Sequence, residues 1–248
     1  MLRHKDTTIL SELNDFFTSS EKAMEPILGI IRSLIFSDKK FGFSQANNQK
    51  FSNHSKIAFL LLFPFFEIKT TWHYADSALY RFLSCGKDIF YRLMNDSSID
   101  WRSLAYSINI QLIRKVKKNS DLNNSNPSCL IVDDTDLPKT GRCIEMIGRI
   151  FSHVTQTSIT GFKGLFMGFH DGKSLFCLDF SLHGEKGKNQ NKPYGLTATQ
   201  AKMRYSKKRD KDSKGSERTN DYFLSKIDSM IKMIRLAISK GIRFDYLL

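Results

Sequence analysis

Three carboxylates and a hydroxyl follow one short apolar run and could support metal chemistry. The run Cys129–Val132 is followed at once by Asp133, Asp134, Thr135 and Asp136. An apolar run without alternation predicts a strand that is covered on both faces in the centre of a sheet, with Asp133 where the strand reaches the sheet edge. Carboxylates on rigid backbone suit Mg²⁺ or Mn²⁺, which prefer oxygen ligands. Asp133 is therefore the candidate metal ligand and catalytic residue.

The neighbouring carboxylates have two readings. Alternation along a strand places Asp133 and Asp134 on opposite faces, so that one points to a site and the other points away. In the second reading, Asp134 and Asp136 only cap or initiate a turn before Pro138, as Asp often does. The residues alone leave both readings open.

The segments after this run must position Asp133 if it forms part of a site. Two β-rich runs, Gly161–His170 and Lys173–Leu182, flank Asp171-Gly172, and this pattern predicts a hairpin with a type I′ turn. Further along, Asp221–Lys240 has the spacing of an amphipathic helix. The residues expected to face inward are Phe223, Leu224, Ile227, Ile231, Ile234 and Ile238.

The end of this helix and the next element are also predicted. Gly241 is expected to end the helix in the left-handed conformation. Ile242–Leu248 (IRFDYLL) then begins a new strand. A strand with an acidic residue, a hairpin, a helix and a further strand together predict a sheet with helical cover.

The first half of the chain has helical spacing. Apolar stripes occur between Leu10 and Phe17 and between Ile27 and Ile35, and Asp100 is placed to cap a helix that starts at Trp101. The ten-residue run Ile57–Phe66 is too short for a bilayer span and predicts a buried helix or strand. Two short helical patterns meet at Cys85-Gly86, as in a helix-turn-helix, although a plain helical core explains them equally.

Composition changes between the halves and sets the predicted domains. Asn123–Ser128 is rich in Asn, Ser and Pro and predicts a linker. We expect a helical, DNA-binding region at residues 1–122, a linker at 123–128 and a second domain at 129–248. The fold class is α+β or α/β, with a helical region before a mixed sheet.

Positive charge is concentrated in one segment. The 248 residues carry 38 Lys and Arg against 25 Asp and Glu, a formal net charge of +13. Gly184–Arg218 alone holds 11 basic and 4 acidic side chains, net +7, and few large apolar residues. We predict a long exposed loop whose charge favours binding to nucleic acid. Contact with the ribosome and simple solubility are the alternative roles for this charge.

Several classes of protein are excluded by composition and spacing. The four cysteines form no CxxC pair and the six histidines show no HxH or HxxxH spacing, which argues against a zinc site or a disulfide framework. The charged N-terminus has no apolar core of a secretory signal. We expect a chain without membrane association, located in the cytoplasm.

The order of these elements is that of the opening of the RNase H-like fold, and three segments carry a family resemblance. Leu130–Gly141, Gly161–Asn189 and Arg204–Lys211 resemble the catalytic half of bacterial insertion-sequence transposases of the DDE class. Gly86–Arg102 resembles the N-terminal half of these enzymes, which binds the transposon ends. The resemblance implies a helical DNA-binding region followed by an RNase H-like domain.

The resemblance also implies an activity and its residues. The family cuts transposon ends and joins them to target DNA with two divalent ions, Mg²⁺ or Mn²⁺, held by Asp, Asp and Glu. Asp133, in an Asp-x-Thr context, matches the first Asp and would bridge the two metals. Lys139, Lys163 and the cluster Lys207-Lys208-Arg209 would hold DNA phosphates, with ordinary surface positions as the second reading. The implied partners are DNA at inverted-repeat ends and a second copy in a homo-oligomer, with no small-molecule cofactor.

The sequence departs from the family at the two other ligands. The second Asp is expected at the end of the strand that begins near Arg243, and the Glu on a later helix, yet the sequence reaches Leu248 without either. Asp245 falls too early in that strand to replace the second Asp. We therefore expect an incomplete RNase H-like domain, inactive in transposition on its own, with an open sheet edge and exposed apolar surface.

Three functions remain as alternatives. The favoured one is a C-terminally truncated transposase of a decayed or frameshifted element. The second is a DNA-binding module without catalysis that occupies transposon ends and inhibits the full enzyme. The third is an unrelated metal-dependent phosphodiesterase whose site is complete within these residues.

Overall fold

A computed structural model describes residue 11 and residues 24–44, 49–119 and 127–248. The chain forms two compact units, residues 1–104 and 105–248. The boundary between them falls within helix α5 (Trp101–Asn119), whereas the sequence predicts a boundary at residue 122. The predicted stripe between Leu10 and Phe17 and most of the predicted linker at 123–128 lie outside the described residues.

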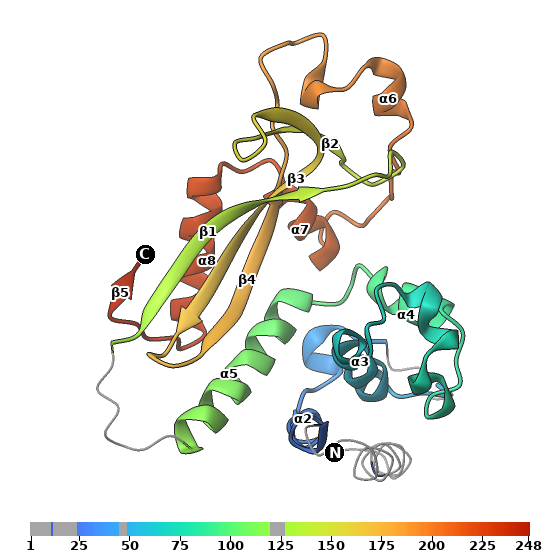
Figure 1. The fold of residues 1–248 in the computed structure, drawn as a ribbon, viewed down its shortest axis with the longest axis vertical. Helices are drawn as coiled ribbons and strands as arrows, with labels where there is room; N and C mark the ends of the chain where they lie inside the picture. The colour runs from blue at the N-terminus through green and yellow to red at the C-terminus, as the bar shows by residue number, and fades with distance from the viewer. Residues whose placement is uncertain (1–10, 12–23, 45–48, 120–126) are drawn as a thin grey trace. The chain divides into compact units, whose positions relative to one another are not determined.

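The first unit is built from short helices (Figure 1). The apolar run Ile57–Phe66 is divided between two helices, with Pro64 in the first turn of the second. Its first seven residues are buried or half-buried as predicted, whereas Pro64 and Phe65 are exposed. Within the described part of the chain, no helix is long and apolar enough to cross a membrane. The elements of this unit are α2 (Met24–Arg32), η1 (Lys39–Phe41), α3 (Asn53–Leu62), η2 (Phe63–Phe66), η3 (Thr71–Asp76), η4 (Ala78–Arg81), α4 (Asp88–Met94) and the first turn of α5.

An aromatic core holds the first unit together. The rings of Tyr74 and Phe90 are fully buried with their centroids 4.8 Å apart, and the Tyr74 hydroxyl donates to the Leu83 carbonyl at 2.7 Å. The segment before Cys85-Gly86 folds as two 3₁₀ helices, η3 and η4. The prediction that this segment forms the first helix of a helix-turn-helix is therefore wrong. The predicted cap of α5 is confirmed, because Asp100 Oδ1 accepts from the Ser103 amide at 2.9 Å.

The second unit has an α+β fold around a curled mixed sheet (Figure 1). Strand β3 is central: it pairs antiparallel with β1 along ten residues, with β2 through its first five residues and with β4 through its last eight. Strand β5 runs parallel to β1. The strands are β1 (Cys129–Pro138), β2 (Gly148–Ser152), β3 (Thr157–His170), β4 (Leu175–His183) and β5 (Tyr246–Leu247).

The predicted hairpin is confirmed and its predicted turn is wrong. β3 ends at His170 and β4 begins at Leu175, so four residues connect the strands instead of the two of a type I′ turn. Asp171 organises this connection, because its backbone amide donates to the Ser174 carbonyl and its Oδ1 accepts from the Ser174 amide at 2.7 Å. The Asx geometry of Asp171 therefore replaces the tight turn.

Helix α8 (Lys226–Ser239) covers the sheet together with residues 105–119 of α5. Its buried residues are Ser229, Met233 and Ala237, which pack against a core that includes Leu130 of β1 and residues of β3 and β4. The predicted inward stripe is therefore wrong except at Ile234, which packs against this core. The predicted residues that are exposed are Phe223, Leu224, Ile227, Ile231 and Ile238, with exposed fractions between 38% and 65%.

The error in α8 has a simple cause. Both stripes repeat with helical spacing, and the longer apolar side chains lie on the outer one. The helix also starts later than predicted, because Ser225 caps it by accepting from the Asp228 amide at 3.0 Å. Gly241 has the predicted positive φ, +85°, directly after the C-cap residue Lys240.

The basic segment 184–218 is exposed over most of its length, as predicted, and contains short helices that the sequence pattern did not predict. They are η5 (Pro193–Gly195), α6 (Ala198–Lys202) and the start of α7 (Lys214–Asp221). Thr197 and Gln200 form a capping box at the start of α6, and Ser213 caps α7. Caps therefore order a segment that has little apolar content.

Candidate functional site

Asp133 lies inside β1 rather than at its end. Because β1 continues to Pro138, the predicted position at the end of the strand is wrong. The Asp133 side chain is exposed, and its Oδ1 accepts from the amide of Asp134 at 2.8 Å. The Val132 amide donates to the carbonyl of Leu248 at 2.9 Å. Asp133 therefore follows directly after the β1 residue that is bonded to Leu248, the residue after β5.

The two other carboxylates of β1 form ion pairs with lysines. Asp134 points toward α8, where Lys226 Nζ lies 2.6 Å from its Oδ2, so it lies on the face opposite to Asp133 as predicted. Asp136 accepts from Lys163 Nζ at 2.5 Å, and this hydrogen bond holds the pKa of the Asp136 carboxyl below its usual range. The reading of these two residues as turn formers is wrong, because both lie within the strand.

The described residues supply one candidate metal ligand, Asp133, and no complete set of metal ligands. In the described ranges, no group of three or more His, Cys, Asp or Glu side chains is placed to hold a metal ion. Asp245 does not join Asp133, because its Oδ2 accepts from the amide and the hydroxyl of Ser128 at 2.7 and 2.9 Å. Ser128 and Asp133 are five residues apart along extended backbone, about 16 Å. Asp245 therefore links the segment before β5 to Ser128, the residue before β1, by two hydrogen bonds.

The predicted phosphate-binding residues lie in different surroundings. Lys139 is exposed just beyond β1, and its amide donates to the Thr160 carbonyl at 2.8 Å. Lys163 is only 4% exposed and paired with Asp136, so it presents no charge at the surface and cannot hold a phosphate there. Lys208 is exposed, and Lys207 and Arg209 line a pocket.

This pocket, which we call the basic pocket, has a volume of about 580 Å³ and lies wholly within the second unit. Its wall comes from the segment before β2, from the turn and loop around α6, and from the end of α7. The basic residues in the wall are Lys202, Arg204, Lys207 and Arg209, the one acidic residue is Glu145, and the aromatic residues are Tyr194, Tyr205, Tyr222 and Phe223. Four positive and one negative side chain give the wall a formal net charge of +3.

An ion pair closes one side of the basic pocket. Arg209 Nη1 and Nη2 donate to the two carboxylate oxygens of Glu145 at 2.6 and 2.5 Å. These hydrogen bonds lower the pKa of Glu145 and raise the pKa of Arg209. The pair joins the loop after α6 to the segment before β2, so it fixes the position of the neighbouring Lys207. Arg209 is thus a structural member of the predicted basic cluster.

The opposite wall is held by Tyr222, which follows α7. Its ring stands 5.6 Å from that of Tyr194, measured between centroids. Its hydroxyl faces Gly184, where a Cβ atom would overlap the hydroxyl oxygen, so a residue larger than Gly would displace the ring. The hydroxyl has no hydrogen-bond partner among the described residues, and burial raises the pKa of Tyr222.

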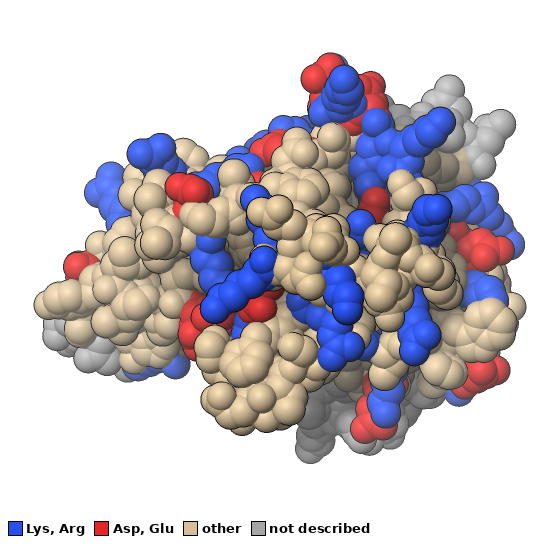
Figure 2. Space-filling model, turned by 90° about the horizontal axis from the view of Figure 1, so that it is seen from above, with Lys and Arg blue, Asp and Glu red and all other residues tan. Residues whose placement is uncertain are grey.

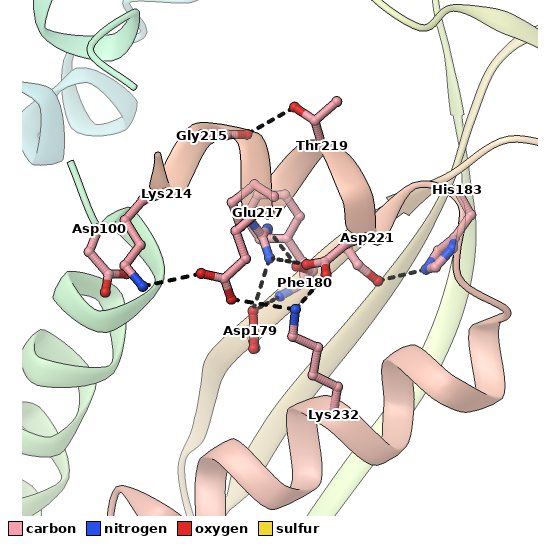
Figure 3. A network of polar contacts seen from close by, with 12 residues as sticks. Asp100, Asp179, Phe180, His183, Lys214, Gly215, Glu217, Thr219, Asp221 and Lys232 are labelled. Atoms are coloured by element: carbon pink, nitrogen blue, oxygen red, sulfur yellow. Dashed lines mark hydrogen bonds and ion pairs between the residues drawn. The ribbon is translucent and has the colours of Figure 1, made fainter. Parts of the chain in front are cut away.

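A buried polar network fixes α7 to the sheet and to α8 (Figure 3). Asp179 of β4 and Asp221 of α7 have side chains that are only 3% exposed. Arg218 of α7 lies 3.8 Å from Asp179 and 3.2 Å from Asp221, and Lys232 of α8 lies 2.8 Å from Asp221. Two cations therefore compensate two buried carboxylates. One side of α7 enters this network while the other side forms the wall of the basic pocket.

His183 lies beside this network at the end of β4. Its Nδ1 lies 3.2 Å from the Leu224 carbonyl and must donate to it, which leaves Nε2 to accept from Ser181 Oγ at 2.6 Å. Burial is the main cause that lowers the pKa of His183, and the positive charge of Lys226 adds to it. His183 is therefore neutral, and it holds the chain after α7 against β4 (Figure 3).

Basic side chains are spread over the surface seen from the side of α6 and β2 (Figure 2). The charge was predicted from the sequence, whereas Arg204, Tyr205 and Tyr194 were missed as wall residues. A usable signal was present, because Arg204-Tyr205 precedes the basic cluster directly, and aromatic residues interleaved with basic ones are typical of nucleic-acid surfaces. Glu145 had no such signal, since it lies 64 residues from its partner Arg209.

Comparison of the chain with models of protein families, with curated proteins and with solved structures found no match.

Proposed function

We propose that this chain acts in DNA transposition as part of an RNase H-like transposase of the DDE class, with Asp133 as its first catalytic carboxylate. The observation that carries the proposal is the strand arrangement around Asp133. In the sheet, β4 pairs antiparallel with β3, and β3 pairs antiparallel with β1. Strand β5 comes after α8 in the chain and lies on the other side of β1, parallel to it. This is the order of strands that the resemblance to the RNase H-like fold implies.

The level at which β5 meets β1 supports the same proposal. The resemblance expects the second catalytic Asp at the end of the strand that begins near Arg243. Leu248, the residue after β5, accepts from the amide of Val132, the residue before Asp133. A carboxylate a short distance further along a parallel strand would lie beside Asp133.

Metal chemistry needs more ligands than the described residues supply. Asp134 and Asp136 are neutralised by Lys226 and Lys163, and Asp245 caps Ser128. A two-metal site needs several carboxylates to hold both ions. The polypeptide of residues 1–248 is therefore expected to bind DNA without cutting it, and we assign no chemical step to it alone.

The positive charge of the chain supports DNA binding, which is one part of the proposed function. The second unit presents the basic pocket with its net charge of +3, and the chain as a whole has a net charge of +13. Phosphate contacts by Lys and Arg release counterions, so affinity should fall steeply with salt. Salt-dependent DNA binding is expected both for a part of a complete transposase and for an inhibitor that occupies the transposon ends.

The experiment is a mobility-shift assay combined with a nicking assay. The probe is a duplex of the terminal inverted repeat that the proposal implies, and a shuffled duplex of equal composition is the control. We expect a complex that prefers the repeat and no nicking with Mg²⁺ or Mn²⁺. Absence of any DNA binding would contradict the proposal. Nicking that Asp133→Asn abolishes would favour a self-sufficient phosphodiesterase instead.

The second candidate function is a DNA-binding module that inhibits transposition. It is favoured by the ion pairs of Asp134 and Asp136, which leave Asp133 as the carboxylate of β1 without a cationic partner among the described contacts. In a transposition assay with a complete enzyme of the same element, added chain should then lower the yield of joined products. An unchanged or raised yield would exclude the inhibitor.

A further inference from the structure

The basic pocket has the size of a small-ligand site and a basic, aromatic lining. Its volume of about 580 Å³ lies within the usual range of ligand pockets, about 300–1,000 Å³. It is built from three segments that are held by the Glu145–Arg209 pair and by the network around Asp221. The pocket is thus a formed feature of the second unit.

The charge in the pocket suits one phosphate group rather than a metal. The carboxylate of Glu145 is occupied by Arg209. Arg204 has no carboxylate partner in the described part of the chain, and its Nε donates only to the Ala201 carbonyl, at 3.4 Å. Its guanidinium also lies 6.0 Å from the ring of Tyr194. Arg204 therefore offers planar donors for a phosphate close to an aromatic surface.

The aromatic residues supply stacking surfaces of two kinds. Tyr194 and Tyr222 are packed into the wall, whereas Tyr205 and Phe223 are 53% and 54% exposed at the pocket. Exposed aromatic rings beside cations are the elements that bind single-stranded nucleic acid, because each base presents a flat face for stacking. Asn220 and Thr219 add polar groups at the same wall.

We infer that the basic pocket binds one unpaired nucleotide of a DNA strand, with its base on Tyr205 and its phosphate on Arg204. A base inside a duplex enters such a pocket only when it is flipped out of the stack, which costs unpairing and unstacking energy. A single-stranded overhang or a frayed end avoids this cost, so we expect the nucleotide to come from one of these. This inference rests on the proposed function, since it names the part of the DNA that the second unit holds.

The test compares three ligands by fluorescence. The first is a blunt duplex, the second is the same duplex with a three-nucleotide overhang that contains 2-aminopurine, and the third is 2-aminopurine deoxyribonucleoside monophosphate. We expect the overhang duplex to bind about tenfold more tightly than the blunt duplex, with the probe fluorescence quenched by stacking. Tyr205→Ala should abolish the preference, and Tyr205→Phe should retain it, because stacking needs the ring and not the hydroxyl.

Two control variants separate the pocket from general charge and aromaticity. Tyr246→Ala removes a similarly exposed tyrosine, 60% against 53%, on β5, and should leave the preference unchanged. Lys173→Gln removes an exposed charge at the tip of the β3–β4 hairpin and should also leave it unchanged, whereas Arg204→Gln should weaken the overhang complex selectively.

Each remaining outcome overturns the inference in its own way. Equal affinity for blunt and overhang duplexes would overturn the inference and leave the proposed function intact. Binding of the monophosphate without an overhang preference would overturn it by identifying a free nucleotide as the ligand. Absence of binding to all three ligands would overturn the inference together with DNA binding as the function.

Discussion

Arg209 and Glu145 are 64 residues apart in the chain and form a bidentate ion pair at 2.6 and 2.5 Å, with both side chains less than a third exposed. The pair connects the basic loop to the segment before β2. It therefore has two effects, because it stabilises the fold and also cancels one positive charge in the basic pocket.

Replacing Glu145 separates these two effects. Glu145→Gln should lower the free energy of unfolding by about 1–2 kcal/mol, because it removes a charge-assisted bidentate interaction that is partly buried. The same change should raise DNA affinity at low salt and steepen the salt dependence by about one counterion. Urea unfolding and a salt titration of DNA binding measure both.

The matched control is Glu67→Gln, an exposed acidic position in the first unit. It should change neither stability nor the salt slope measurably. Weaker DNA binding by a folded Glu145→Gln variant would contradict the prediction, because it would show that the carboxylate takes part in binding.

Lys163 and Asp136 form a cross-strand ion pair on the covered face of the sheet. Lys163→Met removes the cation beside Asp136, and Lys226→Met removes the cation beside Asp134, whose ion pair is more exposed. Lys163→Met should lower the free energy of unfolding at least twice as much as Lys226→Met, because a less solvated ion pair responds more strongly to the loss of one partner. Chemical denaturation of both variants measures this.

The double variant Lys163→Met/Asp136→Leu tests the same pair independently. It should recover most of the lost stability, because two apolar groups can replace a buried pair. A double variant less stable than Lys163→Met would contradict this view of the pair. Unchanged DNA affinity in both variants is also expected, because Lys163 is buried.

His183 should make stability depend on pH. Burial lowers the pKa of His183 in the folded chain, while the hydrogen bond to the Leu224 carbonyl and the charges of Asp221 and Asp134 oppose this shift. As pH falls through about 6.5, the ordinary His value, the unfolded chain therefore takes up a proton that the folded chain resists, and the free energy of unfolding falls. This loss is complete below the folded pKa.

The measurement is urea unfolding at pH values between 8 and 5 for the natural chain and for His183→Asn. The natural chain should lose stability over this range, whereas the variant should lose less. Protonation of carboxylates with lowered pKa values, such as Glu145, reduces the free energy of unfolding only as the pH falls through their ordinary pKa, near 4.5. These groups therefore do not mimic the effect of His183. Identical profiles of the two proteins would show that His183 is not the titrating group.

Two buried tyrosine hydroxyls are predicted to differ in their contribution to stability. The Tyr222 hydroxyl has no partner in the described structure, so Tyr222→Phe should be neutral or stabilising by up to about 1 kcal/mol. The Tyr74 hydroxyl donates to the Leu83 carbonyl at 2.7 Å, so Tyr74→Phe should cost about 1–2 kcal/mol. Equal losses in thermal or urea unfolding would mean that Tyr222 has a hydrogen bond in solution.

Local patterns predicted several features of both units. The apolar run at 129–132, the hairpin around Asp171, the cap at Asp100 and the positive φ of Gly241 all follow from chain-local physics, and each is present. The same is true of a strand after Gly241, although the regular part is only Tyr246–Leu247.

Features that depend on distant partners were missed. The polar run at 133–136 reads as the end of a strand, yet it continues as β1 because β3 pairs with it and because Lys163 and Lys226 neutralise Asp136 and Asp134. The inward face of α8 was misassigned, since neighbouring elements decide between two stripes. The walls of the basic pocket also come from segments far apart in the sequence.

We propose that residues 1–248 bind DNA ends, and the described residues contain no group of three or more side chains that could hold a metal ion. The most direct measurement incubates the purified chain and its Asp133→Asn variant with end-labelled inverted-repeat duplex, with and without Mg²⁺ or Mn²⁺, and scores complexes and nicks in parallel. We predict equal, salt-sensitive complexes for both proteins and no nicks for either. Metal-dependent nicks made by the natural chain and absent with Asp133→Asn, or no complex at any salt concentration, would contradict the claim.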